Sequence, residues 1–65
     1  MRYDTFKNLK MNKQGIRPCV IIQTGEEGNI VKVDKYHDRL LVVAMRHGYI
    51  NIQKQWFNYT EIAIW

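Results

Sequence analysis

The segment TGEEGNIVKVDKYHDRLLVV, residues 24–43, decides the fold. Two glycines bracket a pair of acids, and a β-branched run, 29–34, follows them. A polar tip at 35–38 separates this run from a second and more apolar one at 39–45. Runs of this length, rich in β-branched residues and bounded by turn residues, are typical of strands. The segment therefore predicts a β-hairpin.

The rest of the chain adds three predicted strands. RPCVIIQ (17–23) is apolar, with a proline at its start, where a strand tolerates it. YINIQ (49–53) and EIAIW (61–65) alternate in polarity. The aromatic-rich KQWFNY (54–59) is expected to be a link with a single 3₁₀ turn. Five short strands at this spacing predict an all-β fold, a small antiparallel barrel or sandwich.

The N-terminal segment, residues 1–15, is expected to be an appendage to a barrel formed by 16–65. Apolar residues at Tyr3, Phe6 and Leu9 have the spacing of a short amphipathic helix, which would stop near the end of this segment. A flexible basic arm fits the segment equally well, because so short a helix is marginal by itself.

The strand at 39–45 is apolar on both faces, because successive side chains point to opposite sides of a sheet. One face fills the core, and the other needs a cover. We expect the stripe formed by Tyr3, Phe6 and Leu9 to fold back over it. The alternative cover is a second copy of the chain, which predicts a homodimer through the outer face of residues 40–45.

Length and cysteine content limit the class of protein. The 65 residues form one small domain with a marginal core. Cys19 is the only cysteine, so no internal disulfide forms, and a cytoplasmic location is expected. The polar N-terminus is unlike a signal peptide, and no apolar run approaches the ~18 residues of a membrane span. We therefore expect no membrane partner.

Catalytic and metal chemistry lack the residues that they require. His37 and His47 stand apart without a second cysteine, which fits no zinc-site spacing, so neither a metal nor another cofactor is expected. His37 precedes Asp38, an arrangement suited to acid–base work, but the chain has no serine, and Cys19 lies in an apolar strand. The sequence predicts that the protein is not an enzyme.

The net charge of +4 is concentrated at the N-terminus, where residues 1–17 hold five basic residues and one acid. Such a segment attracts an acidic protein surface or nucleic-acid phosphates. Tyr36 at the polar tip is the best candidate for stacking on a base, although Asp34 and Asp38 flank it and repel phosphate. The predicted binding residues are Arg2, Lys7, Lys10, Lys13, Arg17, Lys35, Tyr36, His37 and Arg39.

The large aromatic residues of the last third are Trp56, Phe57, Tyr59 and Trp65. Most of them are expected to close the core, because a small domain depends on every buried ring. One or two left outside would form an anchor for a protein partner.

The hairpin segment resembles a KOW-type element of the SH3-like barrels found in the transcription elongation factor NusG and in certain ribosomal proteins. The features that carry the resemblance are the turn glycine, Gly28, Ile30, Val33-Asp34 and Arg39-Leu40. The resemblance implies that Lys35, Tyr36, His37 and Arg39 contact RNA or a protein partner. Glu26 and Glu27 depart from the basic residues usual in RNA-binding KOW loops.

A second resemblance covers more of the chain. The order of strands, the G-x-x-G turn, GYIN and the final WFNYTEIAI are similar to the SH3-like accessory subunits of photosynthetic electron-transfer complexes, such as the photosystem I subunit PsaE. Trp56, Phe57 and Glu61 stand at the aromatic turn and closing strand of that pattern. This resemblance implies a non-catalytic barrel that helps to dock an acidic partner.

The sequence thus predicts a five-stranded antiparallel SH3-like small barrel with a short basic N-terminal helix or arm. Its expected function is that of a non-catalytic binding module or accessory subunit on an acidic protein or a nucleoprotein complex. One alternative is a KOW-like protein that binds RNA or DNA through the basic arm, and another is a self-associating structural protein. If the protein is such a binding module, the arm supplies long-range attraction to the partner. Reversing Lys7, Lys10 and Lys13 to glutamate is then expected to slow association.

Overall fold

The computed structural model describes residues 1–44 and 54–64. In chain order the elements are α1 (Tyr3–Lys7), β1 (Arg17–Ile21), β2 (Glu27–Asp34), β3 (Arg39–Ala44), β4 (Lys54–Asn58), the 3₁₀ turn η1 (Tyr59–Glu61) and β5 (Ile62–Ile64). In the described part of the chain, no helix has the length and apolar character needed to cross a membrane.

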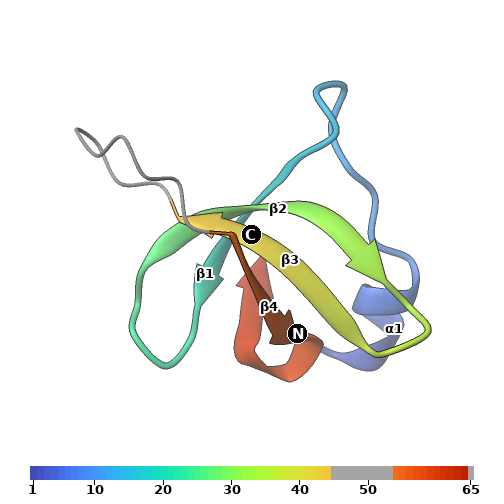
Figure 1. The fold of residues 1–65 in the computed structure, drawn as a ribbon. Coiled ribbons are helices and arrows are strands. Elements are labelled where there is room, and N and C mark those ends of the chain that lie inside the picture. The colour runs from blue at the N-terminus through green and yellow to red at the C-terminus, as the bar shows by residue number, and fades with distance from the viewer. Residues whose placement is uncertain (45–53, 65) are drawn as a thin grey trace.

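The strands form one antiparallel sheet in the order β4-β3-β2-β1-β5 (Figure 1). In the described residues, the predicted antiparallel sheet of five strands is therefore confirmed, but one of these strands, β4, is not at a predicted position. The first and last strands are neighbours, since Cys19 on β1 lies opposite Ile64 on β5. The predicted hairpin is formed by β2 and β3, joined by a tip at residues 35–38.

The prediction for residues 54–59 is wrong, because Lys54–Asn58 is strand β4 rather than a link. Pairing with β3 explains the difference: Phe57 lies opposite Leu40, and Trp56 lies opposite Leu41. Aromatic residues suit a strand that has such cross-strand partners. The expected strand at 49–53 lies outside the described residues.

The expected 3₁₀ turn follows β4, as η1. Its cap explains where it begins: the side chain of Asn58 accepts from the backbone N–H of Thr60 at 3.0 Å, and Glu61 accepts from the backbone N–H of Asn58 at 2.9 Å. This reciprocal arrangement is a capping box. Because Glu61 closes the turn, the last strand begins at Ile62 rather than at residue 61.

The predicted strands at 17–23 and 29–34 leave residues 24–28 for the turn between them, but the turn lies earlier. Strand β1 ends at Ile21, and the turn is closed by Gly25, whose φ of +73° favours glycine. Gly28 is not a turn residue: it is buried within β2. A Cβ atom there would lie 2.8 Å from Cγ1 of Val42 and 2.9 Å from the carbonyl oxygen of Val43. Glycine at this position lets β2 and β3 approach closely.

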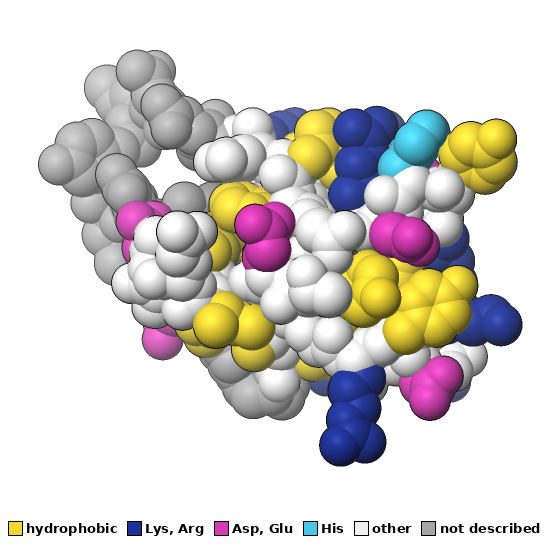
Figure 2. All heavy atoms as spheres, turned by 90° about the horizontal axis from the view of Figure 1, so that it is seen from below, with side chains coloured by type: hydrophobic (Ala, Val, Ile, Leu, Met, Phe, Trp, Pro, Cys, Tyr) yellow, Lys and Arg dark blue, Asp and Glu magenta, His cyan; other side chains and the backbone are white. Residues whose placement is uncertain are grey.

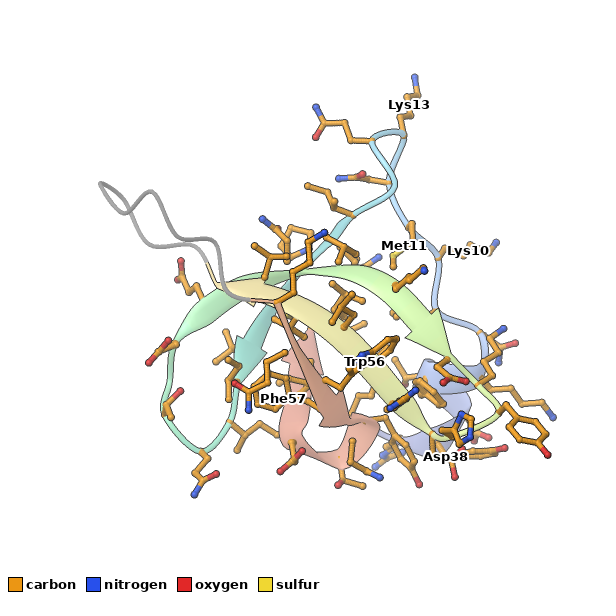
Figure 3. The ribbon with its side chains drawn as sticks, in the orientation of Figure 1. Lys10, Met11, Lys13, Asp38, Trp56 and Phe57 are labelled. Atoms are coloured by element: carbon orange, nitrogen blue, oxygen red, sulfur yellow. The ribbon has the colours of Figure 1, made fainter. Side chains whose placement is uncertain are left out.

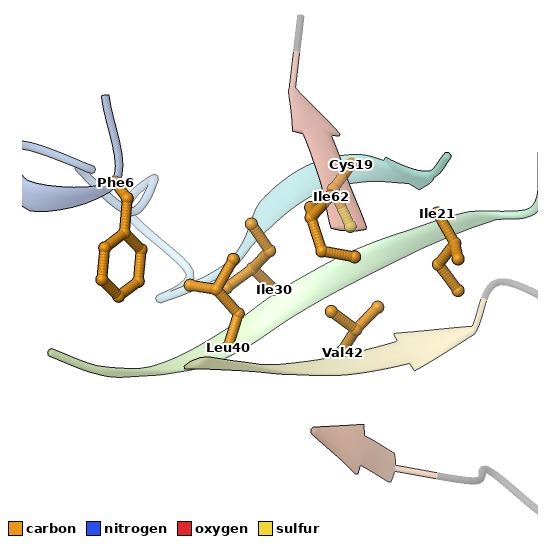
Figure 4. Close-up of a cluster of buried hydrophobic side chains, with 7 residues drawn as sticks. All are labelled: Phe6, Cys19, Ile21, Ile30, Leu40, Val42 and Ile62. Carbon is orange, nitrogen blue, oxygen red and sulfur yellow. The ribbon is translucent and has the colours of Figure 1, made fainter. Parts of the chain in front are cut away.

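The core lies against one face of the sheet (Figure 4). Its buried side chains come from α1 and from strands β1, β2, β3 and β5, and they are Phe6, Cys19, Ile21, Ile30, Leu40, Val42 and Ile62. Phe57 and Tyr59 pack partly buried against this cluster. Trp56 does not join it and is 38% exposed. Of the described aromatic residues in the last third of the chain, two thus pack on the core and one is left outside, within the expectation that most of them close the core.

The N-terminal segment is part of the folded unit rather than a free arm. The side chain of Phe6 is 1% exposed and stacks on Tyr59, with 5.0 Å between the ring centroids. The amino group of Met1 donates to the carbonyl oxygens of Tyr59 and Ile62. The short helix α1 ends at Lys7, well before residue 15.

The expected cover for the outer face of β3 is wrong. Phe6 packs in the cluster that contains Leu40 and Val42, which are the inward-facing residues of β3. Leu41 and Val43 point to the other side of the strand and are half-buried. The helix therefore completes the core and does not cover the opposite face of the sheet.

Candidate binding site on the outer face of the sheet

The outer face is defined here as the side of β2, β3 and β4 that points away from the core. Strand register places its residues in three rows. One row across the sheet is Lys32, Leu41 and Trp56. The rows on either side of it are Asn29, Val43 and Lys54, and Asp34, Arg39 and Asn58.

A β-bulge in β2 creates this arrangement. Ile30 lies opposite Val42 and is fully buried, whereas Lys32 lies opposite Leu41 and is exposed. Residues two apart normally share a face, so an extra residue at Val31 reverses the alternation. Without the bulge, Lys32 and Asp34 would follow Ile30 toward the core.

Arg39 and Trp56 form the centre of the site. The guanidinium carbon of Arg39 lies 4.2 Å from the centre of the Trp56 ring, within the range of a cation–π contact. The two residues are diagonal neighbours, because Arg39 lies opposite Asn58, two positions from Trp56. Trp56 and Phe57 point to opposite sides of β4 (Figure 3).

Asp34 fixes the orientation of Arg39. Nε of Arg39 donates to Oδ2 of Asp34 at 3.0 Å. Nδ1 of His37 lies 2.8 Å from the same oxygen, and the backbone N–H of His37 donates to Oδ1 at 3.3 Å. An ionised carboxylate only accepts, so Nδ1 of His37 carries the proton in this contact. The bond from the His37 side chain, followed by that from Arg39, lowers the pKa of Asp34 to about 2.

The hairpin tip adjoins this site. Tyr36 is 90% exposed, and its ring meets the His37 ring edge-on at a centroid distance of 4.9 Å. Asp38 has a φ of 54°, the left-handed conformation that closes the tip. Its carbonyl oxygen accepts from the backbone N–H of Tyr59 at 3.1 Å, which holds the tip against η1.

The predicted binding residues do not form one surface. Arg39 is at the centre of the site, and Lys35, Tyr36 and His37 are at the adjoining tip. Arg2 precedes α1 and Lys7 is its last residue. The helix contacts η1, next to the hairpin tip, because the ring centroids of Tyr3 and Tyr59 are 5.6 Å apart. Lys13 lies in a separate turn, at the opposite end of Figure 3 from Asp38.

The turn that carries Lys13 is built around Asn12. The backbone N–H of Gly15 donates to the carbonyl of Asn12 at 2.9 Å, and the Asn12 side chain accepts from the N–H groups of Gln14 and Ile16. Arg17 lines an open groove that also includes Lys10, Asp4, Thr5, Asn8, Leu9 and Ile64. Lys10 and Arg17 thus lie beside α1, whereas Lys13 lies in a turn apart from it.

The face seen from below in Figure 2 is of mixed charge. Acidic side chains are dispersed among basic and hydrophobic ones. This view shows no continuous basic surface on that face. In the described residues, no three His, Cys, Asp or Glu side chains come together as a metal site requires.

Sequence reasoning missed Trp56, Lys32 and Lys54 as site residues, and it treated Asp34 only as a source of repulsion. The signal for Trp56 was the alternation in KQWFN, which places Trp56 and Phe57 on opposite faces once the segment is a strand. The alternation of the sequence could not indicate that Lys32 points to the outer face, because the bulge at Val31 reverses that alternation.

Fold and site together define a small antiparallel β-sheet protein with an arginine–tryptophan pair on its outer face. Comparison with known proteins finds no family model, no curated sequence and no solved structure that matches the chain.

Proposed function

We propose that the chain is an SH3-like, non-catalytic binding module for a partner with an acidic surface, a protein or a nucleoprotein complex. The strand order, with β1 between β2 and β5, supports the SH3-like architecture. The outer face around Arg39 and Trp56 is the proposed contact surface.

The observation that carries this proposal is the way Arg39 is held. Its guanidinium is anchored by Nε to Asp34 and backed by the Trp56 ring. Within the described part of the chain, the Arg39 side chain donates one hydrogen bond, from Nε to Asp34. The Nη groups of such an arginine are preorganised to grip a carboxylate or a phosphate in a forked pair of hydrogen bonds.

The charge of the outer face favours an anionic partner. Its rows contain three cations, Lys32, Arg39 and Lys54, and one acid, Asp34. Asp34 accepts hydrogen bonds from both His37 and Arg39, so its charge is compensated within the protein. The repulsion of anions that the sequence indicated at Asp34 is therefore reduced, and an oxyanion meets a positive surface.

The remote basic residues Lys7, Lys10 and Lys13 play a second part in this proposal. They lie outside the rows of the outer face, so they contribute through the long-range field. That field speeds association and is screened by salt over about 8–10 Å at physiological ionic strength. Arg39 acts instead on the lifetime of the complex.

Self-association through residues 40–45 is a weaker proposal. Lys32 and Lys54 flank the half-buried Leu41 and Val43 on the outer face. Two copies meeting on this face would bring these cations together, and Asp34, the acid in its rows, already accepts a hydrogen bond from Arg39, so the approach costs free energy. Sedimentation of the protein at two concentrations tests it, and a concentration-dependent dimer that Leu41→Glu abolishes would favour it.

The main proposal is tested with a polyanion that carries only carboxylates. Labelled poly-L-glutamate is titrated with the wild-type protein, R39A and K13A, each verified as folded by circular dichroism. Both variants lose one positive charge, but only R39A loses the guanidinium group that Asp34 and Trp56 hold in place. We expect R39A to weaken binding about tenfold or more and K13A to weaken it less than threefold, since a charged hydrogen bond outweighs a remote charge. Equal losses in both variants would refute a defined site.

A further inference from the structure

We infer that the acidic partner is single-stranded nucleic acid, which lies across the outer face with its bases on the aromatic side chains and its phosphates on the cations. This inference rests on the proposed function and specifies the partner of the same site. It is carried by the combination of exposed rings, a preorganised arginine and a compensated carboxylate at one end of the sheet.

The exposed planar groups favour nucleic acid as the anionic partner. Exposed Trp and Tyr side chains also anchor protein partners, but every nucleotide brings a planar base next to a phosphate, so it matches the rings and the cations together. Trp56 is 38% exposed and Tyr36 is 90% exposed, and between them along the chain lies Arg39, whose side chain is 42% exposed. Bases stack both on aromatic rings and on guanidinium planes, whatever their sequence. The site therefore presents stacking surfaces beside its phosphate ligand.

The same geometry favours a single strand over a duplex. The outer face of a sheet is open, and Trp56 lies within it, opposite Leu41. Bases that are already paired and stacked inside a duplex are not available to such a ring, so a duplex engages only the cations. The stacking contribution is gained only by unpaired bases.

Charge sets the path of the strand. Lys32 and Lys54 lie in different rows on either side of Leu41, so cations occur across the width of the outer face. Asp34 and Arg39 form the row next to the hairpin tip, and Lys35 follows in the tip itself. Glu27 begins β2 at its opposite end, so the acidic β1–β2 turn is remote from this row. Phosphates are expected over the tip end of the sheet.

The test separates the contribution of the bases to binding from that of the phosphate charge, and all of the oligonucleotide ligands have the same length. Fluorescein-labelled oligo(dT), oligo(rU), an abasic deoxyribose-phosphate oligomer and a duplex are titrated by anisotropy at low and physiological salt, with poly-L-glutamate in parallel. We expect the two base-containing strands to bind roughly 5- to 150-fold tighter than the abasic oligomer, which corresponds to one stacked base. The duplex should bind no tighter than the abasic oligomer.

Variants then locate the bases. Tyr36→Ala should reduce the preference for bases over the abasic oligomer and leave abasic binding within twofold. Trp56→Ala should reduce the same preference and also weaken abasic binding, because it removes the ring that holds Arg39. Tyr36 is almost fully exposed, so its replacement tests the inference even if Trp56→Ala proves unstable. K13A, which removes a charge outside the outer face, should weaken base-containing and abasic ligands by the same factor.

The outcomes distinguish the inference from the proposed function. Equal binding of abasic and base-containing strands, or a preference for duplex, would overturn the inference while R39A-sensitive binding of poly-L-glutamate would uphold the proposed function. Binding of poly-L-glutamate without binding of any oligonucleotide would do the same. If the protein binds none of these polyanions at low salt, both the inference and the proposed function are overturned.

Discussion

The guanidinium carbon of Arg39 lies 4.2 Å from the centre of the Trp56 ring, while Nε of the same side chain donates to Asp34. Three strands thus contribute to one arrangement: β2 supplies the carboxylate, β3 the guanidinium and β4 the ring. A solvent-facing arginine ordinarily samples many rotamers, and holding it in one costs entropy. Here the ring and the carboxylate hold it before any partner binds.

The first prediction concerns this pair. In a double-mutant cycle with Arg39→Met and Trp56→Leu, we expect the two side chains to be coupled by about 0.5–1 kcal/mol, the usual strength of a partly exposed cation–π contact. Urea unfolding of the four proteins gives the coupling free energy. Losses that simply add would show that the contact contributes nothing to the free energy of unfolding.

The second prediction is a pH dependence that originates at Asp34. Hydrogen bonds, first from His37 and then from Arg39, lower its pKa from 3.8 to about 2 in the folded protein. A lowered pKa contributes stability in full above the unfolded value, and this contribution is lost as the pH falls through the folded value. The stability difference between wild type and Asp34→Asn should therefore shrink from about pH 5 to about pH 2.

His37→Ala is the control for that titration. It removes the leading hydrogen bond, so the pKa of Asp34, followed by NMR of its carboxyl carbon, should rise toward 3.8. An unchanged titration in this variant would mean that His37 does not hold the carboxylate.

The third prediction compares two glycines. Gly28→Ala places a Cβ 2.8 Å from a Val42 methyl group and 2.9 Å from a backbone oxygen, so it should reduce the free energy of unfolding by about 1–3 kcal/mol. At Gly15 a Cβ meets nothing within 4 Å, but φ is +76°. Asparagine tolerates that conformation, so Gly15→Asn should cost well under 1 kcal/mol. A cost at Gly28 no larger than that at Gly15 would contradict the close approach of β2 and β3.

The fourth prediction tests whether α1 belongs to the core. Phe6 is 1% exposed, so Phe6→Ala should cost about 3–5 kcal/mol, whereas Tyr3→Ala, at a half-exposed ring, should cost much less. A domain of this size has a total stability of roughly 3–10 kcal/mol, so the Phe6 variant should be largely unfolded. Circular dichroism and urea unfolding measure both. Native stability in Phe6→Ala would restore the flexible-arm alternative.

The fifth prediction concerns the Cys19 thiol, which is fully buried. Burial raises its pKa from 9.0 to about 11. Because the folded pKa is the higher one, the thiol's contribution to stability is complete below about pH 9 and is lost as the pH rises through about 11. At pH 8 the native protein should react with a disulfide reagent far more slowly than the urea-unfolded chain. Comparable rates would show that the thiol is accessible.

Much of the fold followed from local patterns. The hairpin, its tip at residues 35–38 and the strand that begins at Arg39 were predicted, because polar turn residues interrupt β-branched runs there. Strand β4 was missed, because its strand character depends on pairing with Leu40 and Leu41 as much as on its own residues. The tip residues and Arg39 were identified as candidates, whereas the sequence did not indicate which of the aromatic residues of the last third would stay outside the core.

By itself, the sequence determined the β class of the fold, the hairpin and the excess of positive charge, because turn chemistry, β propensity and charge are properties of neighbouring residues. Only the tertiary structure decided which side chains share a face. The bulge at Val31 turned Lys32 and Asp34 outward, and the pairing of β3 with β4 placed Arg39 beside Trp56. It also placed Phe6 in the core. Such relationships depend on strand register between distant segments, which local alternation does not specify.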